Sequence, residues 1–255
     1  MRERQQRTGT MSGNPSLSLK LLIGASALAG IVLTIVGLLQ ADTENAIMLA
    51  ALVVAVGAAE FFTVELFVDS HVSVSGAAVM AAGAIFGLPG VVFCAPVFAL
   101  AGHARTRPAP FKTVFNYGAF TIAGAAYVLV FRQLGGHVAT TDYQALALPA
   151  VAAALANMAI SSVLVTVAIC LDSQKSFRSV WSADFLWLVP QYAVMGAVAV
   201  GVMLALVHFG TWSLAVFALP LGSLSEALHT RSEAMNMRRR ALETIQSVQT
   251  HRRTA

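Results

Sequence analysis

The side chains best suited to chemistry gather in one short stretch that holds Glu60, Glu65, Asp69 and His71. Carboxylates and an imidazole at this spacing could bind a cation, relay a proton or pair with a buried arginine. Glu60 stands out because a long uncharged run precedes it, and ionisable residues inside membrane segments are functional candidates. We expect Glu60 to be at least half buried among helices. The alternative is that all four side chains are solvated at the membrane boundary.

Two amide side chains, Asn116 and Asn157, lie in or near apolar runs and complete the candidate intramembrane polar site. Such groups commonly form hydrogen bonds between helices, so a packing role competes with ligand binding. The sequence contains no motif of a zinc hydrolase, a serine hydrolase or a phosphate-binding loop. Cys94 and Cys170 are too few for a disulfide framework or a cysteine zinc site. We therefore expect a protein that is not an enzyme and binds no cofactor or metal.

The composition places these residues in a membrane. Of the 255 residues, 57% are hydrophobic and only 11% are charged, whereas about 25% are charged in an average soluble domain. The mean hydropathy is +0.74. A soluble chain of this size could not cover its surface with so few charges, so we predict an all-α, polytopic bundle of membrane helices.

Apolar runs divide the chain into candidate membrane segments. They cover residues 19–39, 46–66, 76–86, 91–104, 114–131, 145–171, 185–209 and 212–228. A helical crossing needs about 20 apolar residues, so the pair at 76–104, joined by a turn at Gly87, is either short and tilted or re-entrant. This gives 6 to 8 membrane segments in a membrane domain at 19–228, between a basic leader at 1–18 and a helical tail at 229–255. Alternating residues near 64–75 predict a small hairpin, and Pro190 predicts a kink in the run at 185–209.

The charges predict the orientation. If the N-terminus is cytoplasmic and all segments cross, Arg132 is the only one of the 16 Lys and Arg residues in an outer connection. Asp42, Glu44 and Asp142 then lie outside. Because Lys and Arg are retained on the cytoplasmic side, we expect a multi-pass inner-membrane protein with both termini in the cytoplasm. The basic residues would meet anionic membrane lipids rather than nucleic acid.

The tail carries a second pattern. Leu228, Met235, Leu242 and Ile245 fall on the a and d positions of a heptad repeat. This spacing predicts a coupling helix that packs on a second copy of the chain or on a cytoplasmic signalling partner. A helix lying on lipid headgroups is the alternative, because Arg238 and its neighbours are basic.

Several segments resemble a known family. They are Glu60-Phe-Phe-Thr-Val-Glu65, Val72-Ser-Val-Ser-Gly-Ala-Ala78, Ile85-Phe-Gly-Leu-Pro89, Phe115-Asn116 after a basic loop, and the tail from Arg240 to Ile245. Together they resemble the multi-helix membrane region found before HD-GYP phosphodiesterase and GGDEF cyclase domains in bacterial signalling proteins. The sequence contains neither an HD dyad nor a GGDEF motif, so the resemblance implies a signal-input role without the catalysis of that family.

Two functions follow as expectations. The first is a non-enzymatic sensory, signal-input or interaction protein that couples through its cytoplasmic C-terminal helix. The alternative is a transporter or substrate-capturing membrane component, whose site would lie near Glu60 and the helix pair at 76–104, because broken helices at mid-membrane mark transport sites.

Overall fold

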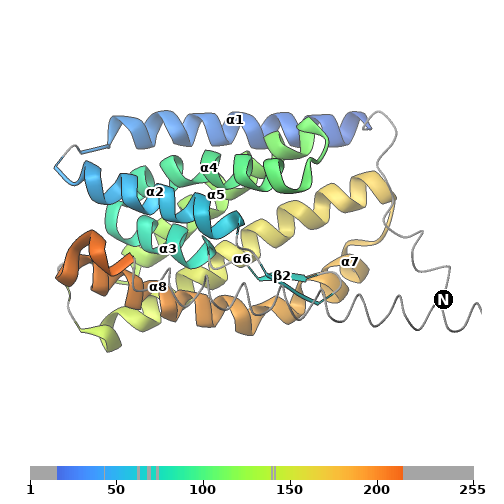
Figure 1. The fold of residues 1–255 in the computed structure, drawn as a ribbon. Coiled ribbons are helices and arrows are strands. Elements are labelled where there is room, and N and C mark those ends of the chain that lie inside the picture. The colour runs from blue at the N-terminus through green and yellow to red at the C-terminus, as the bar shows by residue number, and fades with distance from the viewer. Residues whose placement is uncertain are drawn as a thin grey trace, which may run out of the picture.

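The computed structural model describes residues 16–42, 44–61, 64–67, 70–72, 75–138, 140 and 142–214. Within these residues the chain is helical apart from one short hairpin, so the predicted all-α class is confirmed (Figure 1). The α-helices are α1 (Leu17–Leu39), α2 (Ala46–Phe61), α3 (Ser75–Phe86), α4 (Leu88–Thr106), α5 (Pro110–Gln133), α6 (Tyr143–Ser173), α7 (Phe177–Asp184) and α8 (Val189–Phe209). Short 3-10 turns, Leu186–Leu188 and Gly210–Trp212, flank α8.

Four of these helical segments are long and apolar enough to cross a membrane: α1, α5, α6, and α8 with its last turn. This supports the predicted membrane class. The helices α2 and α3 are shorter, with 16 and 12 residues, which at a rise of about 1.5 Å per residue gives about 24 and about 18 Å. Both are shorter than a hydrocarbon core of about 30 Å.

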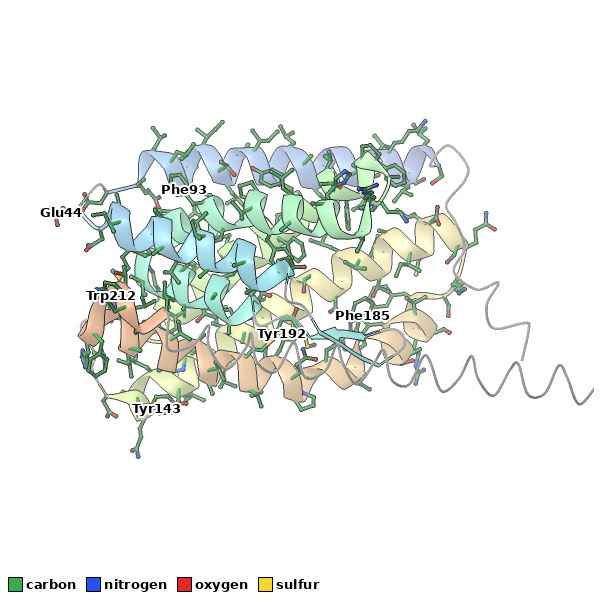
Figure 2. The ribbon with its side chains drawn as sticks, viewed as in Figure 1. Glu44, Phe93, Tyr143, Phe185, Tyr192 and Trp212 are labelled. Atoms are coloured by element: carbon green, nitrogen blue, oxygen red, sulfur yellow. The ribbon has the colours of Figure 1, made fainter. Side chains whose placement is uncertain are left out.

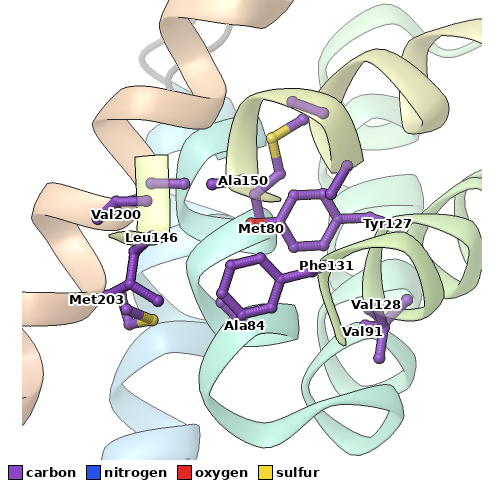
Figure 3. Close-up of a cluster of buried hydrophobic side chains, with 13 residues drawn as sticks. Met80, Ala84, Val91, Tyr127, Val128, Phe131, Leu146, Ala150, Val200 and Met203 are labelled. Atoms are coloured by element: carbon purple, nitrogen blue, oxygen red, sulfur yellow. The ribbon is translucent and has the colours of Figure 1, made fainter. Parts of the chain in front are cut away.

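Many of the buried residues of the bundle are small, and many of the exposed residues are large and apolar. Small residues such as Ala81, Ala123 and Ala153 are buried, whereas large apolar residues such as Ile35 and Leu129 are exposed. Helices packed in lipid approach one another through small residues and leave large apolar side chains for the acyl chains. The centre is filled by a cluster around the stacked rings of Tyr127 and Phe131 (Figure 3).

Local sequence signals explain where several helices begin. The Ser16 hydroxyl accepts a hydrogen bond from the Leu19 amide, and the Asp142 carboxylate accepts one from the Gln144 amide, so each caps its helix. The prediction of a kink at Pro190 is wrong. Pro190 lies in the first turn of α8, where its missing N–H costs no helical hydrogen bond, and the preceding residues form α7 and a 3-10 turn instead.

The bundle has two distinct ends. At one end, which we call the Gly87 end, the tip between α3 and α4 contacts the guanidinium of Arg132, in the last turn of α5. The start of α2 and the end of α8 lie there too. At the opposite Ser16 end, the Ser16 hydroxyl donates a 3.4 Å hydrogen bond to the Leu171 carbonyl, so the start of α1 lies beside the end of α6.

Between α2 and α3 the backbone forms two short strands, β1 (Val64–Phe67) and β2 (Ser70–Val72). They pair antiparallel, with Val64 opposite Val72 and Glu65 opposite His71. The hairpin lies where the alternating sequence predicted one. The leader up to Pro15 and the residues after Leu214 are outside the described residues, and so are the predicted tail helix and its Leu228, Met235, Leu242 and Ile245.

Candidate functional site

Glu60 is a buried carboxylate at the end of α2. Only 5% of its surface is exposed, as expected from its apolar surroundings in the sequence. The hydroxyl of Ser75, the fully buried first residue of α3, donates a 2.8 Å hydrogen bond to Glu60 Oε2. Both residues take part in further interactions. The carboxylate therefore joins the end of α2 to the beginning of α3, near the positive end of the α3 dipole.

A third helix, α4, packs against this pair. A Cβ added to Gly102 of α4 would lie 4.0 Å from Glu60 Oε1, so the backbone of α4 faces the carboxylate. Distances along the helices follow from a rise of about 1.5 Å per residue. By this measure Glu60 lies about 21 Å from Ala46 at the start of α2, and Gly102 lies about 21 Å from Leu88 at the start of α4. Ser75 lies about 17 Å from the other end of α3 by the same rise. The three residues thus share one level, well inside the bundle as measured from the Gly87 end.

The other predicted polar residues are distributed differently. Glu65 and His71 face each other in the backbone register of the hairpin; their side chains, and Asp69 as a whole, are outside the described residues. Asn116 on α5 and Asn157 on α6 are half-buried. Among the described residues neither forms a hydrogen bond to the Glu60–Ser75 pair. The structure therefore brings Glu60 together with Ser75 and Gly102, neither of which the sequence predicted as a site residue.

Hydroxyl groups take part in other hydrogen bonds between helices. The Tyr117 hydroxyl of α5 lies 2.6 Å from the Thr34 hydroxyl of α1, which itself donates to the Gly30 carbonyl. The Trp181 indole of α7 donates a 3.1 Å hydrogen bond to the Ser162 hydroxyl of α6. Single Ser, Thr and Tyr residues in apolar helices are the sequence signal for such bonds, but their partners cannot be read from spacing.

A cavity of about 680 Å³ opens at the Gly87 end, far from Glu60 along the helices. Its polar lining includes Glu44, Asn45 and Thr211, and its apolar lining includes Met48, Phe86 and Leu206. Figure 2 shows Glu44 and Trp212 at this end of the bundle. Among the residues that the structure describes, no three His, Cys, Asp or Glu side chains are grouped closely enough to hold a metal ion.

Comparison with known proteins does not assign the chain to a family. No family model, curated protein or solved structure matches the chain.

Proposed function

We propose that this chain is a non-enzymatic, polytopic inner-membrane protein that receives a signal and passes it on through its cytoplasmic C-terminal helix. The observation that carries the proposal is the path of α8. This helix ends at the cavity, where Leu206, Gly210 and Thr211 line the wall, and it is the last described α-helix before the predicted coupling helix in the sequence. An occupant of the cavity would therefore act directly on the segment that leads to the tail.

The orientation that we propose puts the Gly87 end outside and the Ser16 end in the cytoplasm. The acidic residues Asp42, Glu44 and Asp142 belong to connections at the Gly87 end, and Arg132 lies at the same end in the last turn of α5. The described basic residues of the Ser16 end are Lys20, Arg105, Arg107, Lys112, Lys175 and Arg178. This distribution follows the rule that Lys and Arg stay cytoplasmic.

The number of crossings that we propose is six, within the predicted range of 6 to 8. The helices α2 and α3 are too short to cross, so they enter from outside as a pair and return to Gly87. The crossings are then α1, α4, α5, α6, α8 and the run at 212–228. This arrangement moves the re-entrant pair from 76–104 to 46–86 and still leaves both termini cytoplasmic.

The test of the signalling role is made on the full-length protein in lipid nanodiscs. If the tail is a coupling helix, Leu242→Asp or Ile245→Asp should weaken dimerisation or partner binding while membrane insertion is unchanged. If the tail lies on lipid, neutralising Arg238, Arg239 and Arg240 should release it instead. A spin label at Gln246 that stays fully mobile in the wild-type protein would contradict both versions of the proposal.

Transport remains the second candidate, because Glu60 is buried where the short helix α2 ends and the short helix α3 begins, and interrupted helices mark ion and substrate sites in transporters. Proton movement is the simplest form to test. Proteoliposomes with a trapped pH dye should dissipate a pH gradient if Glu60 relays protons, and Glu60→Gln should abolish this activity. Proton flux that is equal in wild-type and Glu60→Gln vesicles would contradict the transport role.

A further inference from the structure

The cavity at the Gly87 end is open to the surface and has the volume of a small-molecule site. Its volume of about 680 Å³ falls within the range of about 300–1,000 Å³ that is usual for such sites. Residues from the start of α2, the end of α3 and the end of α8 form its walls. Because these segments are far apart in the sequence, an occupant would contact three elements of the bundle at once.

The charges around the cavity favour one sign of ligand. Among the residues that the structure describes, Glu44 lines it and no Lys or Arg does. The other described charges of this end are the carboxylates of Asp42 and Asp142 and the guanidinium of Arg132, which lies against Gly87. His137 and His208 are exposed at the same end and would oppose a cation only when protonated.

The apolar wall of the cavity indicates that the ligand also has an apolar part. Phe86 offers an aromatic ring, which attracts cations as well as apolar groups, and Met48 is a flexible side chain that adapts to different shapes. Buried Leu206 extends this surface. We infer that the cavity binds an organic cation with an apolar body, its charge beside Glu44 and its body against Met48, Phe86 and Leu206.

This inference deepens the proposed function, because the cation would be the signal that the protein receives. Binding itself does not depend on the tail, so the two ideas can fail separately. Saturable cation binding without any change at a tail spin label would contradict the coupling and leave the site intact. A site that binds no cation would refute the inference and leave the tail experiment unaffected.

The probe for the test is radiolabelled tetraphenylphosphonium, with tetraphenylborate as an anion of the same shape. Equilibrium dialysis uses the full-length protein in nanodiscs, and uptake by empty nanodiscs is subtracted. We expect saturable binding of the cation and none of the anion. Equal saturable binding of both ions, or of neither, would overturn the inference.

Matched variants locate the bound charge. Glu44→Gln should weaken binding about fivefold, as expected for loss of one partly exposed charge pair, and Phe86→Ala should weaken it further. Asp142→Asn is the control, because it removes an acidic charge from the same end of the bundle without altering the cavity lining. Since Glu44 is exposed, its replacement should leave the thermal midpoint unchanged. An affinity that falls equally in Asp142→Asn and Glu44→Gln would show a diffuse surface effect and contradict the site.

Discussion

Gly30 of α1 lies so close to Gly118 of α5 that a Cβ added to Gly30 would be 2.9 Å from the Gly118 Cα. At Gly118, an added Cβ would collide with the Ser26 carbonyl of α1. The two backbones therefore touch through small residues, and this close approach also brings Tyr117 within hydrogen-bonding distance of Thr34. The crossing holds α1, whose opposite face is exposed and apolar, against the bundle.

Gly30→Ala should consequently destabilise the protein by about 1–3 kcal/mol, the usual cost of overpacking a closely packed contact. The control is Gly24→Ala on the same helix, where an added Cβ meets nothing within 4 Å. Reversible unfolding in mixed detergent micelles gives the free-energy difference. Equal unfolding midpoints for the two variants would mean that α1 does not depend on this crossing.

Two tyrosines of α5 should differ in how much stability the protein loses when their hydroxyl groups are removed. The Tyr127 hydroxyl is buried and has no hydrogen-bond partner in the described part of the chain, so Tyr127→Phe should be neutral or stabilising. Tyr117 shares a hydrogen bond with Thr34, so Tyr117→Phe should cost about 1 kcal/mol. The same unfolding assay measures both variants, and a large loss of stability in Tyr127→Phe would show that its hydroxyl has a partner.

The Glu60–Ser75 bond can be measured with a double-mutant cycle. Glu60→Ala leaves the buried Ser75 hydroxyl without this acceptor, which should cost about 1–3 kcal/mol. If the bond stabilises the fold, Ser75→Ala made in the Glu60→Ala background should cost less than Ser75→Ala alone. Glu60→Gln should also be more destabilising than Glu44→Gln, because the Glu44 side chain is exposed. Strictly additive costs, or equal effects of the two Gln variants, would count against a structural role for Glu60.

Composition was enough to predict a helical membrane protein, because lipid requires every backbone polar group to be satisfied within helices or closed barrels. It could not predict which face of each helix packs inward. In water an apolar stripe marks the buried face, but in lipid both faces are apolar. Ala25 and Ala29 have the same four-residue spacing as Ser26 and Gly30. The sequence therefore did not show which of these two pairs of small residues packs against α5.

The candidate site was predictable only in part, for a related reason. Glu60 stood out because a charge in an apolar run is costly, and its burial agrees with that argument. Ser75 and Gly102 carried no such signal, since serine and glycine are common in apolar helices. The cavity depends on how three helix ends meet, and Glu44 looked like an ordinary loop residue in the sequence.

Cysteine labelling provides the final test, that of the orientation. Cys94 is buried and Cys170 half-buried, so both are replaced by Ala before single cysteines are introduced at Thr106 or Asp142. Both positions are exposed, but they lie at opposite ends of the bundle, Thr106 at the end of α4 and Asp142 before α6. With the Gly87 end outside, a membrane-impermeant maleimide added to intact cells should label the cysteine at 142 and not the one at 106. Permeabilised cells should label both, which controls for reactivity. Labelling at 106 in intact cells would contradict the proposed orientation. It would show that the acidic end of the bundle, with its cavity, lies in the cytoplasm.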